Sequence, residues 1–274
     1  MSRAIELRAG PIPALWLIHS STGDVACYQP LVAALGGAHR VVAIAPRGLD
    51  AGDPPPIDDL AELARRYAAL IATEQHAGPY RVAGWAMGGV VAAEVAEQLA
   101  AAGRPVDFVA VLDARAPVPE MRGRPVDLAT VALAFANHVA RAAGRELAAA
   151  PAQPAGAAVL AALQAADVAP ASWTAELVER RIAVMQANAR ALFQHSQRRL
   201  RVPLHLFEST AEHPAHPRPP TLGWEAHAEV IREFVPGHHF DLLAAHHVAT
   251  LAAALTAALA RVDRARSEHV AAPP

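Results

Sequence analysis

The sequence predicts an α/β fold in which a mostly parallel central sheet is flanked by helices and interrupted by an inserted helical lid. Short apolar segments alternate with helical segments over the first 112 residues. This alternation stops between residues 117 and 199, where the segments have helical spacing, and strand-like segments return after residue 200. Strands that alternate with helices are typical of a parallel sheet covered on both faces.

Four apolar segments in the first part of the chain are expected to be strands: residues 14–18, 40–45, 80–84 and 106–112. Three segments between them have helical spacing: residues 28–35, 58–76 and 90–102. Asp58 and Asp59 suit the positive N-terminal end of the second helix, and Gly103 follows the third as a common C-terminal stop.

The second part of the chain divides into an insertion, a return to the sheet and a tail. We expect a core of residues 1–116 and 200–265, a helical lid of residues 117–199 and a disordered tail of residues 266–274. Within the lid, two segments look helical (128–143 and 175–197) and one is rich in alanine and proline (148–171). After it we expect strands at 203–208 and 229–235, a proline-rich loop at 214–220 and a closing helix at 241–262.

Bulk composition limits the class of protein. The chain has 274 residues, of which 53% are hydrophobic and 18% charged, so a large buried core is expected and global disorder is not. Its 24 basic and 26 acidic residues nearly balance, which argues against nucleic acid or an anionic membrane as a partner. No apolar run is long enough to span a membrane, and Cys27 is the single cysteine. We expect a soluble cytoplasmic protein, with a monomer as the default.

A glycine-flanked junction follows the third predicted strand, where residues 82–89 read VAGWAMGG. In α/β-hydrolases a G-x-S-x-G segment occupies such a strand-to-helix junction, and its serine is the nucleophile on a strained turn. Gly84 and Gly88 hold the glycine positions, and Ala86 holds the serine position. A glycine-rich helix start that packs closely or holds phosphate is the alternative, although no Walker lysine follows.

A nucleophile of this kind needs an acid and a base. Asp113 directly follows the predicted strand 106–112, and the segment PGHHF at 236–240 offers two histidines after the last strand. This order of nucleophile, acid and histidine is that of α/β-hydrolases. Alternatively, Asp113 is an ordinary turn residue and the two histidines are surface loop residues. Glu208 and Glu212 remain alternative candidates for the acid.

An oxyanion hole and a substrate channel complete the expected site. Its backbone donors would be the N–H of Met87, directly after the junction, and that of Ser21, in the loop after the first strand. Trp85, Met185 and Asn188 are candidates to contact substrate, with core or lid packing as the alternative for each.

Metal and thiol chemistry are not expected. The chain has 14 histidines but no H-E-x-x-H motif, and proline interrupts the pair His213 and His216. His246 and His247 are adjacent near the last predicted helix and are not expected to bind a metal. Cys27 lies beyond the loop of Ser21 and is interpreted as a buried structural thiol.

Taken together, these segments resemble the thioesterase domains that end nonribosomal peptide and polyketide assembly lines. The resemblance spans residues 15–259. It rests on LIHSSTGDVACY, GWAMGG, VLDA and PGHHF, which are similar to a His-Pro-rich glycine loop, GWSMGG, LLDS and GDHF in the family. It implies His239 as the catalytic histidine, with His238 where aspartate is usual. Residues 181–195 resemble the helix that leads out of the family's lid, and the long lid favours domains fused to synthetases over free-standing editing enzymes.

The resemblance implies an acyl-carrier-protein thioesterase that releases a peptide or polyketide by hydrolysis or cyclisation. It needs no cofactor, since the substrate arrives on the phosphopantetheine arm of a carrier protein. Serine attacks the thioester, His239 acts as base and Asp113 orients it. Ala86 removes this covalent route, and loss of a triad in a serine hydrolase costs about 10⁶-fold in turnover.

Two explanations of Ala86 stay open. An engineered serine-to-alanine change is favoured because Asp113, His239, Gly84 and Gly88 remain. A natural loss would instead leave a non-catalytic module that binds acyl chains or carrier proteins. A free-standing editing thioesterase and an ordinary small-ester hydrolase are further alternatives, and the second fits the GWAMGG and PGHHF segments less well.

Overall fold

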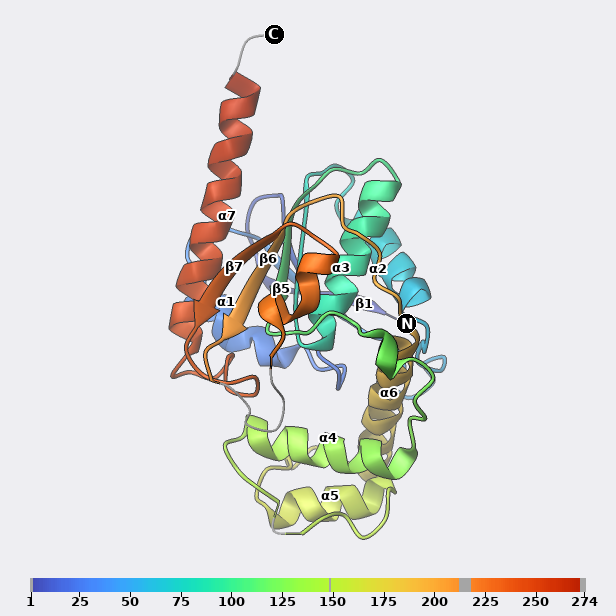
Figure 1. Ribbon diagram of the computed structural model, residues 1–274. Helices are drawn as coiled ribbons and strands as arrows, with labels where there is room; N and C mark the ends of the chain where they lie inside the picture. Colours follow the sequence, from blue (N-terminus) through green and yellow to red (C-terminus); the bar gives the residue numbers. More distant parts are fainter. Residues whose placement is uncertain (1, 148, 212–217, 272–274) are drawn as a thin grey trace.

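The computed structural model describes residues 2–147, 149–211 and 218–271 and consists of a seven-stranded sheet with helices on both faces (Figure 1). The strand order is β1-β3-β2-β4-β5-β6-β7, and among these strands β1 alone runs antiparallel to its neighbour. The strands are β1 (Arg3–Arg8), β2 (Leu15–Ile18), β3 (Val41–Ala45), β4 (Tyr80–Trp85), β5 (Val106–Leu112), β6 (Leu204–Ser209) and β7 (Val230–Val235). The predicted mostly parallel α/β sheet is confirmed.

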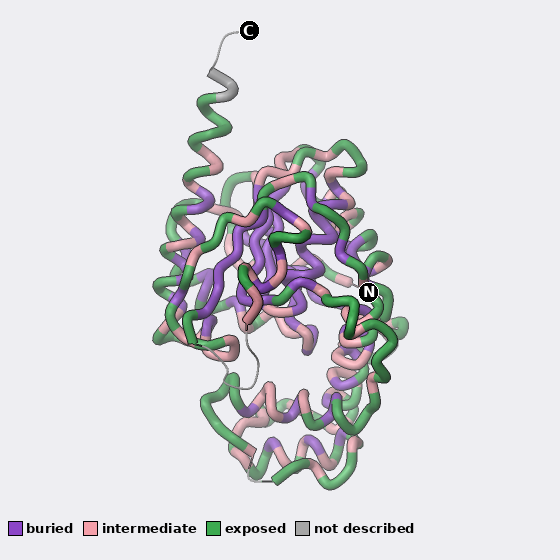
Figure 2. Tube along the Cα trace, in the orientation of Figure 1, coloured by how far each residue is buried: buried purple, intermediate pink, exposed green. Residues whose placement is uncertain are grey.

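Each face of the sheet has its own apolar core. Successive side chains of a strand point to opposite faces, so Trp16 and Ile18 of β2 pack with α2 (Leu60–Glu74) and α3 (Met87–Ala101). Leu15 and Leu17 pack with helices on the other face, α1 (Gln29–Ala34) and α7 (Val248–Ala271). Buried residues concentrate in the strands and in α3 (Figure 2). Of the described helices, none combines the length and apolarity needed to cross a membrane.

Three α-helices between β5 and β6 form a further layer, which we call the helical insertion: α4 (Leu128–Ala142), α5 (Gly156–Ala165) and α6 (Ala175–Gln194). The end of α6 also packs against the main core through Ala191 and Leu192. The facing sides of the three helices share an apolar cluster that includes Phe135, Val159 and Ile182. α4 and α5 lie at one end of the molecule, at the opposite end from the C-terminus of α7 (Figure 1). That this layer acts as a lid stays a prediction.

One strand and one α-helix of the described residues were missed in the sequence. β1 (RAIELR) is an edge strand whose residues are exposed or half-buried, so it carries no apolar run. α5 lies in the alanine- and proline-rich segment 148–171, where the composition masked its helical spacing. Residue 148 and residues 212–217, which include Glu212, His213, His216 and most of the proline-rich loop, lie outside the described residues.

The final helix, α7, begins later and ends later than the predicted range of residues 241–262. It begins at Val248 rather than residue 241, because the Asp241 carboxylate accepts the N–H of His238 at 2.7 Å and closes a turn there. It continues to Ala271, through part of the tail 266–274 that was expected to be disordered. Its alanine, arginine and glutamate residues are good helix formers, which accounts for the continuation. Residues 272–274 lie outside the described residues.

β4 and α3 cross at a distance that only glycine allows. A Cβ on Gly84 would stand 2.2 Å from the carbonyl carbon and oxygen of Gly88. A Cβ on Gly88 would stand 2.6 Å from the carbonyl oxygens of Ile18 and His19. Two glycines therefore bring the end of β4, the start of α3 and the end of β2 into backbone contact.

We predict that Gly84→Ala lowers the free energy of unfolding by about 1–3 kcal/mol or more, because the clash is with backbone atoms that cannot rotate away. Gly52→Ala is the matched control, because a Cβ on Gly52 would have no atom within 4 Å. Gly52 has φ +84, so the expected loss of unfolding free energy is about 1–2 kcal/mol, from the left-handed backbone alone. Urea denaturation of both variants measures the two values. A Gly84→Ala protein as stable as the parent would contradict the crossing geometry.

Candidate active site

Ala86 alone links β4 to α3, in a strained conformation. Its φ of 54° and ψ of −129° lie where L-residues rarely occur, at a cost of the order of 1–3 kcal/mol. Neighbouring backbone holds it there: its N–H donates to the carbonyl of Leu112 at 3.0 Å, and its carbonyl accepts the N–H of Gly89 at 2.9 Å. The methyl group faces a cavity of about 450 Å³. This is the geometry that presents a side chain at the top of such a sheet.

Asp113 and His239 meet at the same cavity. Asp113 follows the end of β5 and His239 lies in the turn after β7, and both line the cavity that Ala86 lines. The Nδ1 of His239 is 2.9 Å from Oδ2 of Asp113. An ionised carboxylate only accepts hydrogen bonds, so Nδ1 carries a proton, and in the neutral ring Nε2 therefore keeps a free lone pair. The pair thus has the geometry of an oriented general base.

The surroundings of Asp113 keep its carboxylate charged. Burial alone would raise the pKa of Asp113, which is 5% exposed. The hydrogen bond from His239, the N–H of Ser209 at 2.8 Å and the charge of Arg218 outweigh burial and hold the pKa below its ordinary value. Asp113 is therefore ionised at neutral pH, as an orienting acid must be.

Arg218 supports this acid and was not anticipated in the sequence. Its guanidinium donates to the carbonyl of Ser209 at 2.6 Å and to its Oγ at 2.9 Å, and it stands 3.5 Å from Oδ1 of Asp113. Glu208, the alternative acid, accepts from Arg232 at 2.7 Å and also lies 3.8 Å from Arg218. Two arginines therefore engage Glu208, whereas Asp113 holds His239.

The expected oxyanion donors come from the start of α3 and from the loop after β2. Met87 is the first residue of α3, where backbone N–H groups have no acceptor within the helix. Ser21 lies in the loop after β2, whose turn is closed by a hydrogen bond from Gly23 N–H to the Ser20 carbonyl at 2.9 Å. The side-chain amide of Asn188 donates to the Ser21 carbonyl at 2.8 Å. Asn188, predicted to contact substrate, thus ties α6 of the helical insertion to this loop.

Trp85 lines a second cavity of about 360 Å³ under the helical insertion, and Phe240 lines both this cavity and the Ala86 cavity. The indole N–H of Trp85 donates to the carbonyl of His239 at 3.1 Å, and its ring lies 5.3 Å from that of His239 and 5.6 Å from that of His138. Burial, reinforced by the nearby His239, lowers the pKa of His138 to about 4, so this second histidine stays neutral. Met185 packs against the apolar cluster of the helical insertion and lines neither cavity.

Cys27 is not positioned to replace the missing nucleophile at Ala86. It lines the second cavity, apart from Ala86, and its Sγ donates to the carbonyl of Asp24 at 3.6 Å. Burial raises the pKa of this thiol, and the charge of Asp24 raises it further. The thiolate, which is the reactive form, is therefore disfavoured.

Comparison with known proteins places the chain in a family. A model described as "Thioesterase domain" matches residues 13–259. The chain is 39% identical over 100 residues to the nonribosomal peptide synthetase btyA of Aspergillus terreus, which covers 36% of this chain and 11% of that protein. It is 32% identical over 106 residues to a dimodular nonribosomal peptide synthase of Bacillus subtilis, covering 39% of this chain and 4% of that protein. The chain thus spans a small part of the curated relatives it matches.

Solved structures give the same result over nearly the whole chain. A four-domain nonribosomal peptide synthetase bound to AMP and glycine is similar with a TM-score of 0.83 and 28% identity, over 92% of this chain and 20% of that one. The wild-type Vlm2 thioesterase domain is similar in fold, with a TM-score of 0.72 and 21% identity over 93% and 96% of the two chains. The α/β-hydrolase fold expected from the sequence is confirmed, and the chain belongs to the thioesterase domain family.

Proposed function

We propose that this chain is built to release a peptide or polyketide from an acyl or peptidyl carrier protein, by hydrolysis or cyclisation, and that Ala86 disables the covalent step. The observation that carries the proposal is one cavity lined by Ala86, Asp113 and His239. Its relatives in nonribosomal peptide synthetases support the substrate class. We place the reaction in the cytoplasm, in keeping with the single cysteine.

The remaining residues would serve a serine at position 86 as follows. Nε2 of His239 takes the hydroxyl proton while Oγ attacks the thioester carbon, and the N–H groups of Met87 and Ser21 stabilise the oxyanion. The carbon–sulfur bond then breaks, and the His239 proton goes to the departing pantetheine sulfur. Water, or an amine or hydroxyl of the chain, releases the acyl group through the same base. Asp113 holds His239 throughout.

With alanine at position 86 the acyl-enzyme cannot form. Binding and the oxyanion donors would leave about 10³- to 10⁴-fold enhancement over water. The intact Asp113–His239 pair supports an engineered serine-to-alanine change, and a natural module that holds carrier-bound chains is the second candidate. In either case the chain binds its thioester substrate unmodified.

The cavity wall suits an acyl chain. Beside the polar pair it carries apolar side chains from α3, from the segment after β5, from α6 and from η3 (Pro220–Ala226): Val90, Ala116, Val118, Leu192 and Leu222. Burial of such side chains against a chain of similar polarity gains about 25 cal/mol per Å². The aliphatic and peptidyl thioesters of carrier proteins match this lining.

We predict that Ala86→Ser creates a thioesterase. On an aminoacyl or peptidyl thioester of N-acetylcysteamine, turnover should rise by up to about 10⁶-fold over the parent. Mass spectrometry of the intact protein should detect an acyl adduct at residue 86 and, in solution, the hydrolysed or cyclised product.

Ala116→Ser is the matched control, because it adds a hydroxyl to the same cavity away from the β4–α3 junction. It should leave the parent inactive. Equal activity of the two serine variants, or no acylation of Ala86→Ser by a broad thioester panel, would contradict the assignment and favour the binding module.

We predict that, in the Ala86→Ser protein, Asp113→Asn lowers kcat by about 10⁴-fold, because an amide no longer fixes the tautomer of His239. Glu208→Gln in the same protein should change kcat far less, since Glu208 bonds to Arg232 rather than to His239. Steady-state kinetics of both variants, with thermal unfolding to check the fold, measures the difference. A larger loss in Glu208→Gln would transfer the acid role to Glu208.

A further inference from the structure

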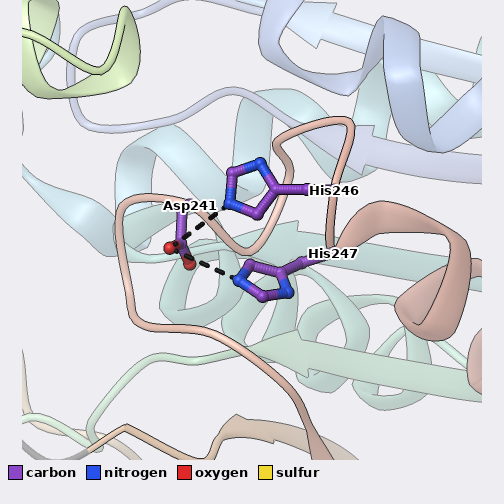
Figure 3. Close-up of side chains that lie close together, drawn as sticks. All are labelled: Asp241, His246 and His247. Carbon is purple, nitrogen blue, oxygen red and sulfur yellow. Dashed lines mark ion pairs between the residues drawn. The ribbon is translucent and has the colours of Figure 1, made fainter.

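Three side chains with metal-binding atoms converge in the turns between β7 and α7. Oδ2 of Asp241 lies 3.5 Å from Nε2 of His247 and 3.7 Å from Nε2 of His246. The three ligand atoms all lie within 4.8 Å of one another. Figure 3 shows both imidazole rings directed at the one carboxylate. This cluster is separate from the Ala86 cavity, whose lining contains none of the three.

The spacing of these atoms fits a shared ion better than direct contact. Hydrogen bonds from ring N–H groups to oxygen measure about 2.7–3.2 Å, so distances of 3.5 and 3.7 Å are long for them. In a tetrahedral zinc site with bonds of about 2.0–2.1 Å, neighbouring ligand atoms stand about 3.3 Å apart. The two distances from Asp241 to the histidines exceed that spacing by only about 0.2 and 0.4 Å.

A fourth residue holds the carboxylate in place. Nδ1 of His238 accepts the N–H of Phe240 at 3.2 Å, which leaves the proton of a neutral ring on Nε2. That N–H faces Oδ2 of Asp241 at 3.1 Å, while Oδ1 of Asp241 accepts the backbone N–H of His238 at 2.7 Å. Such supporting hydrogen bonds orient the ligands of zinc sites.

The side chains of Asp241 and His247 pack directly against Gly237, where there is no room for a Cβ. Gly237 has φ +101, and a Cβ on it would stand 2.5 Å from Oδ1 of Asp241 and 2.6 Å from the ring of His247. Any other residue would therefore push the ligands apart. The side chains of Asp241 and His247 are 21% and 25% exposed and that of His246 is 65% exposed, so an ion can enter from solvent.

We propose that Asp241, His246 and His247 bind one zinc ion, with water as the fourth ligand. Two imidazoles and a carboxylate are ligands that zinc accepts, whereas magnesium and calcium prefer oxygen alone. The bound ion links the turn of His238 and His239 to the residues just before α7. It would thereby brace the segment that presents His239, although zinc binding itself does not depend on the proposed function.

The test uses the full chain without a histidine tag. Isothermal titration with Zn²⁺ alone should show a site of one ion per chain, and Co²⁺ should give the visible absorption of tetrahedral cobalt. Hydrogen exchange of residues 237–248 should slow when Zn²⁺ is added. Loss of a supporting hydrogen bond weakens metal affinity by about 10- to 100-fold. Asp241→Asn and His247→Gln each remove a ligand, so each should weaken Zn²⁺ affinity by more than this.

His76→Gln is the matched control, because His76 is exposed and lies in the loop after α2, outside the turns between β7 and α7. It should bind Zn²⁺ as the parent does. If Asp241→Asn or His247→Gln fails to fold by circular dichroism, His246→Gln replaces it, since His246 is largely exposed. No one-to-one zinc binding by the parent, or equal affinity in the ligand variants, would overturn the proposal.

Discussion

The close crossing of β4 and α3 at Gly84 and Gly88 is the constraint on which the site depends. Because the two backbones touch, a single residue must reverse the chain between them, and Ala86 does so at φ 54°. Its N–H is fixed on the carbonyl of Leu112 at the end of β5, so the turn is tied to the strand that delivers Asp113. Backbone hydrogen bonds, and not a side-chain contact, therefore hold residue 86 in its strained conformation. For this reason alanine can occupy the turn without disrupting it.

The parallel sheet then assembles the rest of the site at one edge. The carboxyl ends of β4, β5 and β7 lead to Ala86, Asp113 and His239, residues far apart in the chain that line one cavity. Charge and hydrogen bonding complete the arrangement, because His239, the N–H of Ser209 and Arg218 together hold the pKa of Asp113 below its ordinary value in spite of its burial. The helical insertion takes part through Asn188, whose amide holds the Ser21 loop, and through α4, which lines the second cavity beside Trp85.

Local patterns made the junction and the acid predictable, because each directly follows a strand with a clear apolar run that is largely buried. His239 follows β7, which is mostly exposed or half-buried, and its assignment came from the resemblance of the PGHHF segment. Contacts that depend on tertiary structure were not predictable. Arg218 approaches Asp113 from a proline-rich loop with no periodic pattern, and Asn188 has the spacing of an ordinary helical residue. Asp241 and His247 were assigned to one helix, where six residues apart would separate them. The turn that replaces this helix brings them together.

Ala86 lines one cavity with Asp113 and His239, so the pKa of a thiol placed at position 86 reports whether His239 acts on the side chain there. The rate of iodoacetamide alkylation of Ala86→Cys would be followed against pH, with Cys27→Ala in the background. Beside His239 the thiol pKa should fall well below its ordinary value of about 8.5, and His239→Ala should restore that value. A thiol at position 86 that titrates near 8.5 whether or not His239 is present would contradict the account.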